Sequence, residues 1–220
     1  MPDCILLDND VVLKACSYRL HVELLDITTV GGTLPCILEV AQFTLRDLVK
    51  RSKKLNDKAA VGAALDIFLG AIERVEPTEA EVELAADFEQ LAQELSLELD
   101  SGESQLFAIL LCRECRALLT GDKRAIAALE KISPPEGYGR ISCIEQLATS
   151  LVSALDYDVL RKKICSEPST DKALSICFSC SADTASSENT LAGLSSYINN
   201  IRHSAPNVLS PGDDLSAVLS

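Results

Sequence analysis

The sequence predicts an α/β protein in which a central, mostly parallel sheet lies between two layers of helices, as in Rossmann-type folds, with a helical extension after this core. Aromatic residues make up only 4% of the chain and Trp is absent, although 47% of residues are hydrophobic. The core must therefore consist of Leu, Ile, Val and Ala, which suits helices covering a small sheet. The chain has 220 residues, enough for one substantial core and a small appendage.

Short apolar runs alternate with helical patterns over the first 155 residues, and this order indicates strands that alternate with helices. The predicted strands lie at 4–7, 72–75, 117–120 and 141–143. Helices are expected at 11–16, 37–48, 56–69, 77–95, 103–111 and 122–132, and from the last strand to residue 155. We therefore predict a core domain at 1–155.

Ser becomes frequent beyond Asp156, and short helical patterns remain at 158–165, 171–178 and 191–202. We predict that residues 156–220 form a helical extension with a frayed tail from Asn207 onward. Its apolar side chains would otherwise be exposed, so we expect the extension to pack on the core. They are Leu160, Ile164, Ile176, Phe178, Leu194 and Ile201.

The charge balance restricts where a nucleic acid could bind. Lys and Arg total 20 against 33 Asp and Glu, which gives a net charge of −13. The protein as a whole therefore repels polyanions, and any nucleic-acid site has to be local. Basic runs at 50–54 and 123–124 could lead RNA phosphates to such a site. A basic helix end is also expected from the helix dipole alone.

The nine cysteines are an odd number, and they lie in apolar segments instead of framing short loops. This pattern predicts reduced thiols in a core and a cytoplasmic protein. No stretch approaches 18 uninterrupted apolar residues, and the first ten residues lack a basic region. We expect no targeting segment and no membrane-spanning segment.

Two acidic residues directly follow predicted strands. Asp8 follows the strand at 4–7, and Asp122 follows the strand at 117–120 after Gly121. Ligands bind at the carboxyl ends of strands in an open α/β sheet, because loops there bring distant side chains together. If the two strands are neighbours, both carboxylates lie at one crevice. Each residue alone would also serve as a helix cap.

Two further carboxylates are expected at the same crevice. Glu103 opens the helix before the strand at 117–120, and Glu39 lies in the first turns of the helix at 37–48. Asp47, one helical face away on the same predicted helix, is the alternative candidate for this ligand position. Four such carboxylates need a cation, and Mg²⁺ or Mn²⁺ prefers oxygen ligands. The chemistry expected of such a site is metal-assisted phosphodiester cleavage.

These residues resemble the PIN-domain nuclease family. Residues 5–13, ILLDNDVVL, are similar to the opening of that family, in which a hydrophobic strand, Asp and a small residue precede an apolar helix. Gly102-Glu103 and the later LLTGDKRAI at 118–126 are similar to its third and fourth acidic positions. Two positions depart from the pattern, because Asp10 replaces the usual Asn and Glu103 stands where Asp is commoner. The resemblance covers residues 4–150.

The resemblance implies a metal-dependent nuclease that acts mainly on single-stranded RNA, with Asp8, Glu103 and Asp122 as metal ligands. Glu39 is the weakest assignment, since little motif surrounds the family's second acidic position. The extension after Asp156 has no counterpart in minimal PIN toxins. A homodimer and an antitoxin-like protein are the candidate protein partners.

Two alternatives remain open. One is a PIN-like binding or regulatory module whose acidic pocket does not turn over substrate. The other is a phosphatase similar to the haloacid dehalogenases, which open with a strand and Asp-x-Asp-x-Val, as Asp8 and Asp10 would. That family would place another Asp four residues after Asp122, where this chain has Ile126.

Overall fold

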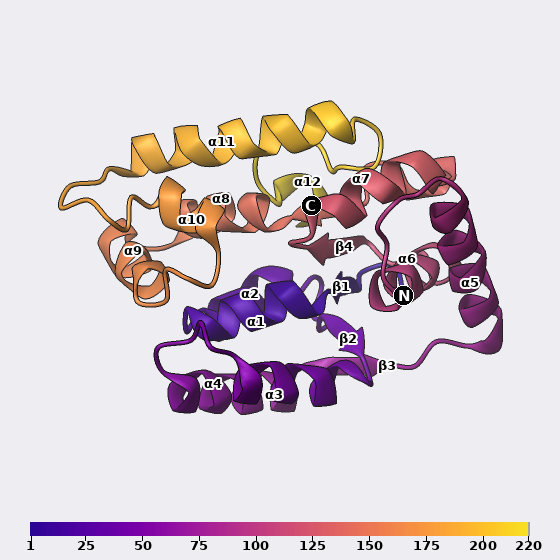
Figure 1. Cartoon of the computed structure of the whole chain (residues 1–220), viewed down its shortest axis with the longest axis horizontal. Helices are drawn as coiled ribbons and strands as arrows, with labels where there is room; N and C mark the ends of the chain where they lie inside the picture. Colours follow the sequence, from indigo (N-terminus) through magenta and orange to yellow (C-terminus); the bar gives the residue numbers. More distant parts are fainter. Residues whose placement is uncertain (220) are drawn as a thin grey trace.

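The computed structural model describes residues 1–219 and has an α/β/α arrangement, shown in Figure 1. Five short strands form one sheet in the order β3-β2-β1-β4-β5, and all pairings are parallel. The strands are β1 (Ile5–Leu7), β2 (Cys36–Leu38), β3 (Glu73–Val75), β4 (Ala117–Thr120) and β5 (Ile141–Cys143). Nearly all strand residues are buried, because helices cover both faces of the sheet. The predicted fold class is confirmed.

Helices connect the strands and continue after the last one. In the first half they are α1 (Asn9–Ser17), α2 (His21–Thr28), α3 (Ala41–Arg51), α4 (Lys58–Ala71) and α5 (Glu79–Glu94). The second half contains α6 (Ser101–Cys112), α7 (Lys123–Ile132), the 3₁₀ turn Pro135–Gly137, α8 (Ile144–Ala154), α9 (Tyr157–Cys165), α10 (Lys172–Cys177), α11 (Ser187–Ser204) and α12 (Ser216–Leu219). Helices α1 to α4 pack together, α5 packs on α6, and α11 lies along α7 and α8.

The prediction of one helix over 37–48 is wrong. Residues 36–38 form β2, which pairs with β1 and β3, and α3 begins only at Ala41. The apolar spacing of Ile37, Leu38 and Ala41 imitates a helical stripe, but the first two belong to a strand that is buried on both faces. Glu39 consequently lies in the turn between β2 and α3, outside the helix.

The extension packs on the core as predicted, with one exception. Five of the six apolar side chains expected to be buried are buried, whereas Ile176 is 65% exposed. The prediction of a frayed tail is wrong for the described residues after 206, because Val208, Leu209 and Leu215 are buried. The Ile141 N–H donates to the Val208 carbonyl at 3.0 Å, so this segment continues along the edge strand β5. Ser220 lies outside the described residues.

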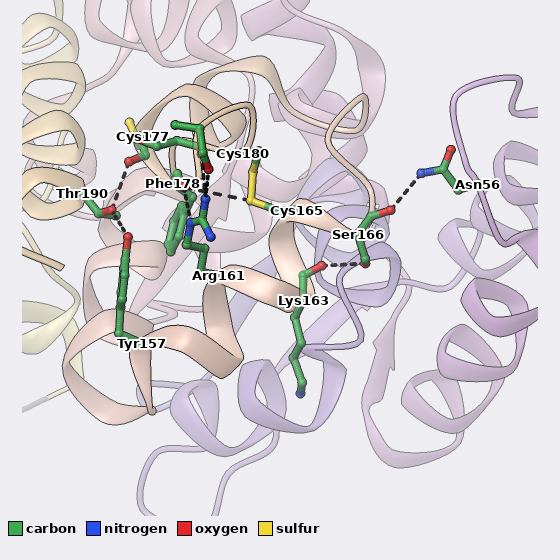
Figure 2. Close-up of a disulfide and its surroundings, with 12 residues drawn as sticks. Asn56, Tyr157, Arg161, Lys163, Cys165, Ser166, Cys177, Phe178, Cys180 and Thr190 are labelled. Atoms are coloured by element: carbon green, nitrogen blue, oxygen red, sulfur yellow. Dashed lines mark hydrogen bonds between the residues drawn. A yellow bond between two sulfur atoms is a disulfide. The ribbon is translucent and has the colours of Figure 1, made fainter. Parts of the chain in front are cut away.

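The prediction that all cysteines are reduced is wrong for one pair. Cys165 at the end of α9 and Cys180 after α10 form a disulfide, shown in Figure 2. The other seven cysteines are free, and all of them except Cys112 are buried. Among residues 1–219, none of the helices combines the length and the apolar character needed to cross a membrane.

Candidate functional site

A cleft of roughly 1040 Å³ opens at the carboxyl ends of β1 and β4. The strand order reverses between these two neighbours, because the chain moves outward from β1 to β3 and then returns to β4 on the other side. Such a switch point is the usual position of a ligand in an open α/β sheet. Five carboxylates line the cleft, namely those of Asp8, Asp10, Asp100, Glu103 and Asp122.

Asp8 ends β1 and caps α1, and it is only 9% exposed. Its carboxylate accepts hydrogen bonds from the Asn9 backbone N–H at 2.6 Å and from the Thr120 hydroxyl at 3.0 Å. Burial, together with the nearby charge of Asp10, raises the pKa of Asp8 to about 6, although both hydrogen bonds oppose the shift. The Thr120 oxygen also accepts the Asp122 N–H at 3.1 Å. This one hydroxyl therefore joins the two acidic strand ends.

Glu103 faces the cleft from the first turn of α6 and is 7% exposed. It forms a capping box with Asp100, in which each side chain accepts the other's backbone N–H, at 3.0 Å and 2.9 Å. Burial raises the pKa of Glu103 to about 8, and the charges of Asp100, Asp8 and Asp122 add to the shift. These charges act on Glu103 because the carboxylates share one cleft.

Asp122 caps α7 by accepting the backbone N–H of Arg124 at 2.8 Å. The Arg124 guanidinium also lies 3.0 Å from its carboxylate and contacts Glu98 as well. Burial raises the pKa of Asp122, but the bonds and charge of Arg124 outweigh it, and the pKa lies below its ordinary value. Of Asp8, Glu103 and Asp122, Asp122 is therefore the acid that most readily stays ionised.

Glu39 does not line the cleft, in contrast to the sequence prediction. Its backbone N–H donates to the Val75 carbonyl at 2.9 Å, and its half-buried carboxylate accepts from Gln42. Asp47 is exposed and pairs with Arg51 at 2.9 Å, one turn along α3. Of the residues predicted for the site, Asp8, Glu103 and Asp122 thus meet, whereas Glu39 and its substitute lie elsewhere.

The sequence prediction did not include a positively charged side chain that lines the cleft, that of Lys14. Lys14 of α1 lines the cleft, and its ammonium lies 2.6 Å from Asp10 and 2.6 Å from Asp171. Burial lowers the pKa of Lys14, but its two carboxylate partners outweigh this and raise it. A Lys one turn after an Asp is a detectable ion-pair pattern within α1. Asp171 belongs to the extension, and no local pattern connects it with Lys14.

The basic groups proposed to lead RNA to the site differ in their availability. Lys123 and Arg124 line the cleft, but Lys123 contacts the buried Glu145 at 2.5 Å and Arg124 is paired with Asp122. The run at 50–54, which follows the last residues of α3 that line the cleft, has four exposed basic side chains. Arg51 of this run is paired with Asp47, and Lys50 lines a separate pocket with Arg46 and Lys58. The run is thus an exposed cationic surface that begins two residues after the cleft-lining Leu48.

The donor chemistry of the cleft fits a hard divalent cation, since Mg²⁺ and Mn²⁺ prefer carboxylate oxygens. A cation would also offset the burial and the neighbouring negative charges that together raise the pKa of Glu103. Within residues 1–219, however, no group of three or more His, Cys, Asp or Glu side chains is close enough together to hold a metal ion. Asp8, Glu103 and Asp122 are each bonded to donors of the chain instead. They would have to turn toward one another to bind a metal.

Comparisons of this chain with protein-family models, with curated proteins and with solved structures gave no match. The resemblance to PIN-domain nucleases therefore depends on the sequence motifs at 5–13, 102–103 and 118–126 alone.

Proposed function

We propose that this chain is a divalent-metal-dependent endoribonuclease of the PIN-like type, which cleaves single-stranded RNA in the cleft between β1 and β4. The observation that carries the proposal is the meeting of Asp8, Glu103 and Asp122 at the switch point of the sheet. These residues come from three separate parts of the chain. Helix capping explains each of them singly, but it does not require all three to face one cleft.

The electrostatics support a cation-dependent site. The pKa of Glu103 is about 8, so this side chain holds its proton at neutral pH when no cation is bound. Asp8, Glu103 and Asp122 are the residues that would hold Mg²⁺ or Mn²⁺. The metal would supply an activated water and stabilise the charge of the phosphate during in-line displacement. Because its ligands must be deprotonated, we expect metal affinity to rise with pH through about 8.

The walls of the cleft are compatible with a single-stranded nucleic acid. Val40, which precedes α3, and Thr44 and Leu48 of α3 also line the cleft and offer a partly apolar surface to bases. Lys50 and Arg51 end the same helix and Lys53 and Lys54 follow it, and these four exposed basic side chains are suited to phosphates. In a chain with a net charge of −13, this arrangement provides the local attraction that an RNA substrate needs.

The test is cleavage of a mixed-sequence single-stranded RNA with Mn²⁺, with EDTA, and by the Asp8→Asn plus Asp122→Asn variant. We expect cleavage only with Mn²⁺ and its loss in the variant. Glu39→Gln is the matched control, and because Glu39 lies outside the cleft it should keep activity within about threefold of wild type. If the double variant cleaved as well as wild type, the proposed site would be refuted.

A second candidate is a PIN-like binding or regulatory module without turnover. It is favoured by the partners already present in the cleft, where Lys14 neutralises Asp10 and Arg124 neutralises Asp122. Retained Mn²⁺ binding without RNA cleavage would support this module. The phosphatase alternative has weaker support, because Ile126 stands where that family has Asp and is completely buried.

We propose the cytoplasm as the location, since seven of the nine cysteines are free thiols and six of these are buried. Fractionation of intact cells would test this, and recovery of the protein outside the cytosolic fraction would contradict it. A homodimer or an antitoxin-like partner also remains a prediction. Light scattering and co-purification would test it.

A further inference from the structure

A largely buried ion cluster connects the extension with the cleft. The Lys14 ammonium lies 2.6 Å from an oxygen of Asp10 and 2.6 Å from an oxygen of Asp171. The Lys14 and Asp171 side chains are only 10% and 12% exposed, whereas that of Asp10 is 39% exposed. Water therefore screens the contact between Lys14 and Asp171 poorly, and it is stronger than a surface ion pair.

The backbone next to Asp122 leaves room for this cluster. A Cβ atom at Gly121 would lie 2.0 Å from Asp10 Oδ2 and 2.9 Å from Lys14 Nζ. Gly121 joins β4 to Asp122, so the ammonium lies at the wall of the cleft beside a proposed metal ligand. Lys14 is thus a cation placed among the carboxylates that would bind a metal.

The segment that carries Asp171 is firmly anchored. The Cys165–Cys180 disulfide closes residues 165–180 into a loop, and Arg161 donates to three backbone carbonyls at and beyond the end of α10, as Figure 2 shows in part. Glu167, which is completely buried, accepts two backbone N–H groups before α4 at 2.7 and 3.0 Å. Asp171 also caps α10 by accepting the Leu174 N–H at 3.0 Å. These contacts fix the position of its carboxylate.

We propose that Asp171 is a positioning residue that holds the Lys14 ammonium away from Asp8, so that a divalent cation does not compete with it for the cleft carboxylates. An ammonium and a metal ion are attracted to the same oxygens. With Asp171 present, Lys14 has two carboxylate partners, neither of which is a proposed metal ligand. Without it, Lys14 keeps only Asp10 and becomes an internal competitor of the metal. This inference rests on the proposed metal-dependent function.

The experiment measures Mn²⁺ affinity from the electron paramagnetic resonance signal of free Mn²⁺ at about pH 8. The variants are Asp171→Asn, the double variant Lys14→Met plus Asp171→Asn, and Asp158→Asn. Asp158 is exposed in the first turn of α9, so its change removes the same charge from the extension away from the cleft. The double variant removes the largely buried pair as a unit and leaves no largely buried charge unpaired. Thermal melts confirm that each variant is folded.

We expect Asp171→Asn to weaken Mn²⁺ binding about tenfold, the double variant to restore it to within about threefold of wild type, and Asp158→Asn to leave it unchanged. Wild-type affinity in Asp171→Asn would overturn the inference. Equally weak binding by both Asp171 variants would also overturn it, because the loss would then come from a disturbed segment and not from the released ammonium.

A readout without metal separates this inference from the proposed function. The side-chain ammonium of Lys14 is followed by ¹H–¹⁵N NMR, because a hydrogen-bonded, largely buried ammonium exchanges slowly with water. We expect the Lys14 ammonium signal to have a different chemical shift in Asp171→Asn than in wild type, and its protons to exchange faster with water. An unchanged signal would refute the positioning role. If wild type bound no Mn²⁺ and the signal still changed, the metal-dependent function would fail while the role of Asp171 in holding Lys14 would stand.

Discussion

Replacing Glu103 by Gln should alter how stability depends on pH. Gln keeps an oxygen that can accept the Asp100 N–H, and the capping box tolerates either residue. The pKa of Glu103 is about 8 in the folded protein, against an ordinary value of 4.5. Between these values the folded protein holds a proton that the unfolded chain has released. Each pH unit in that interval therefore lowers the free energy of unfolding by about 1.36 kcal/mol.

Over the whole interval the wild type loses on the order of 5 kcal/mol through Glu103. The contribution is fully present below pH 4.5 and is lost as the pH rises through about 8. The Gln variant has no such proton, so its stability relative to wild type should increase over the same range. The raised pKa of Asp8 affects both proteins in the same direction and largely cancels in the comparison.

The assay is urea unfolding of both proteins, followed by circular dichroism at several pH values from about 5 to about 9. We expect similar stability at the acidic end and a variant that is more stable by about 2 to 5 kcal/mol at the alkaline end. Glu83→Gln, an exposed position on α5, is the control and should run parallel to wild type. If the curves for wild type and Glu103→Gln were parallel, the argument for a buried, proton-holding Glu103 would be wrong.

Three further predictions concern the ion cluster at Lys14 and the extension. Gly121→Ala should lower the free energy of unfolding by about 1 to 3 kcal/mol in urea titrations, because the new Cβ would lie 2.0 Å from Asp10; unchanged stability would contradict this. Replacing Cys165 and Cys180 by Ser removes a disulfide that joins residues 15 positions apart. The free energy of unfolding should fall by about 3 kcal/mol in the same measurement. A variant as stable as the oxidised wild type would show that the disulfide does not stabilise the fold. Deleting residues 156–220 exposes the apolar surface that they cover and should give an insoluble or less stable protein in sedimentation and melting assays. A soluble core of equal stability would rule out this interdependence.

Strands buried on both faces could be predicted from the sequence, since their apolar runs are short and bounded by turn residues. The strands at 117–120 and 141–143 match β4 and β5. β2 could not be recognised, because its apolar residues continue in register with those of α3 and imitate one helix. Read as one helix, this pattern places Glu39 in a first helical turn instead of a loop, which is why the sequence predicts Glu39 as a site residue.

The parts of the site that depend on adjacency to a strand could be predicted, and the parts that depend on tertiary packing could not. Asp8 and Asp122 directly follow their strands, so their meeting follows from strand order. The contact between Lys14 and Asp171 depends on how α10 is placed against α1. The Cys165–Cys180 pairing has a similar origin, because nine cysteines allow many pairings and composition favours none of them.

The segment after α11 covers a sheet edge that is exposed while the protein is being synthesised. β5 is an edge strand, and an uncovered edge offers free N–H and C=O groups to other chains. Here the Ile141 N–H donates to Val208 and the Ile141 carbonyl accepts from Ser210, at 3.0 and 2.7 Å. During synthesis at about 5 to 20 residues per second, several seconds separate β5 from the segment that covers it. Aggregation of nascent chains should therefore be most pronounced in that interval, and stalling before residue 207 would prolong it.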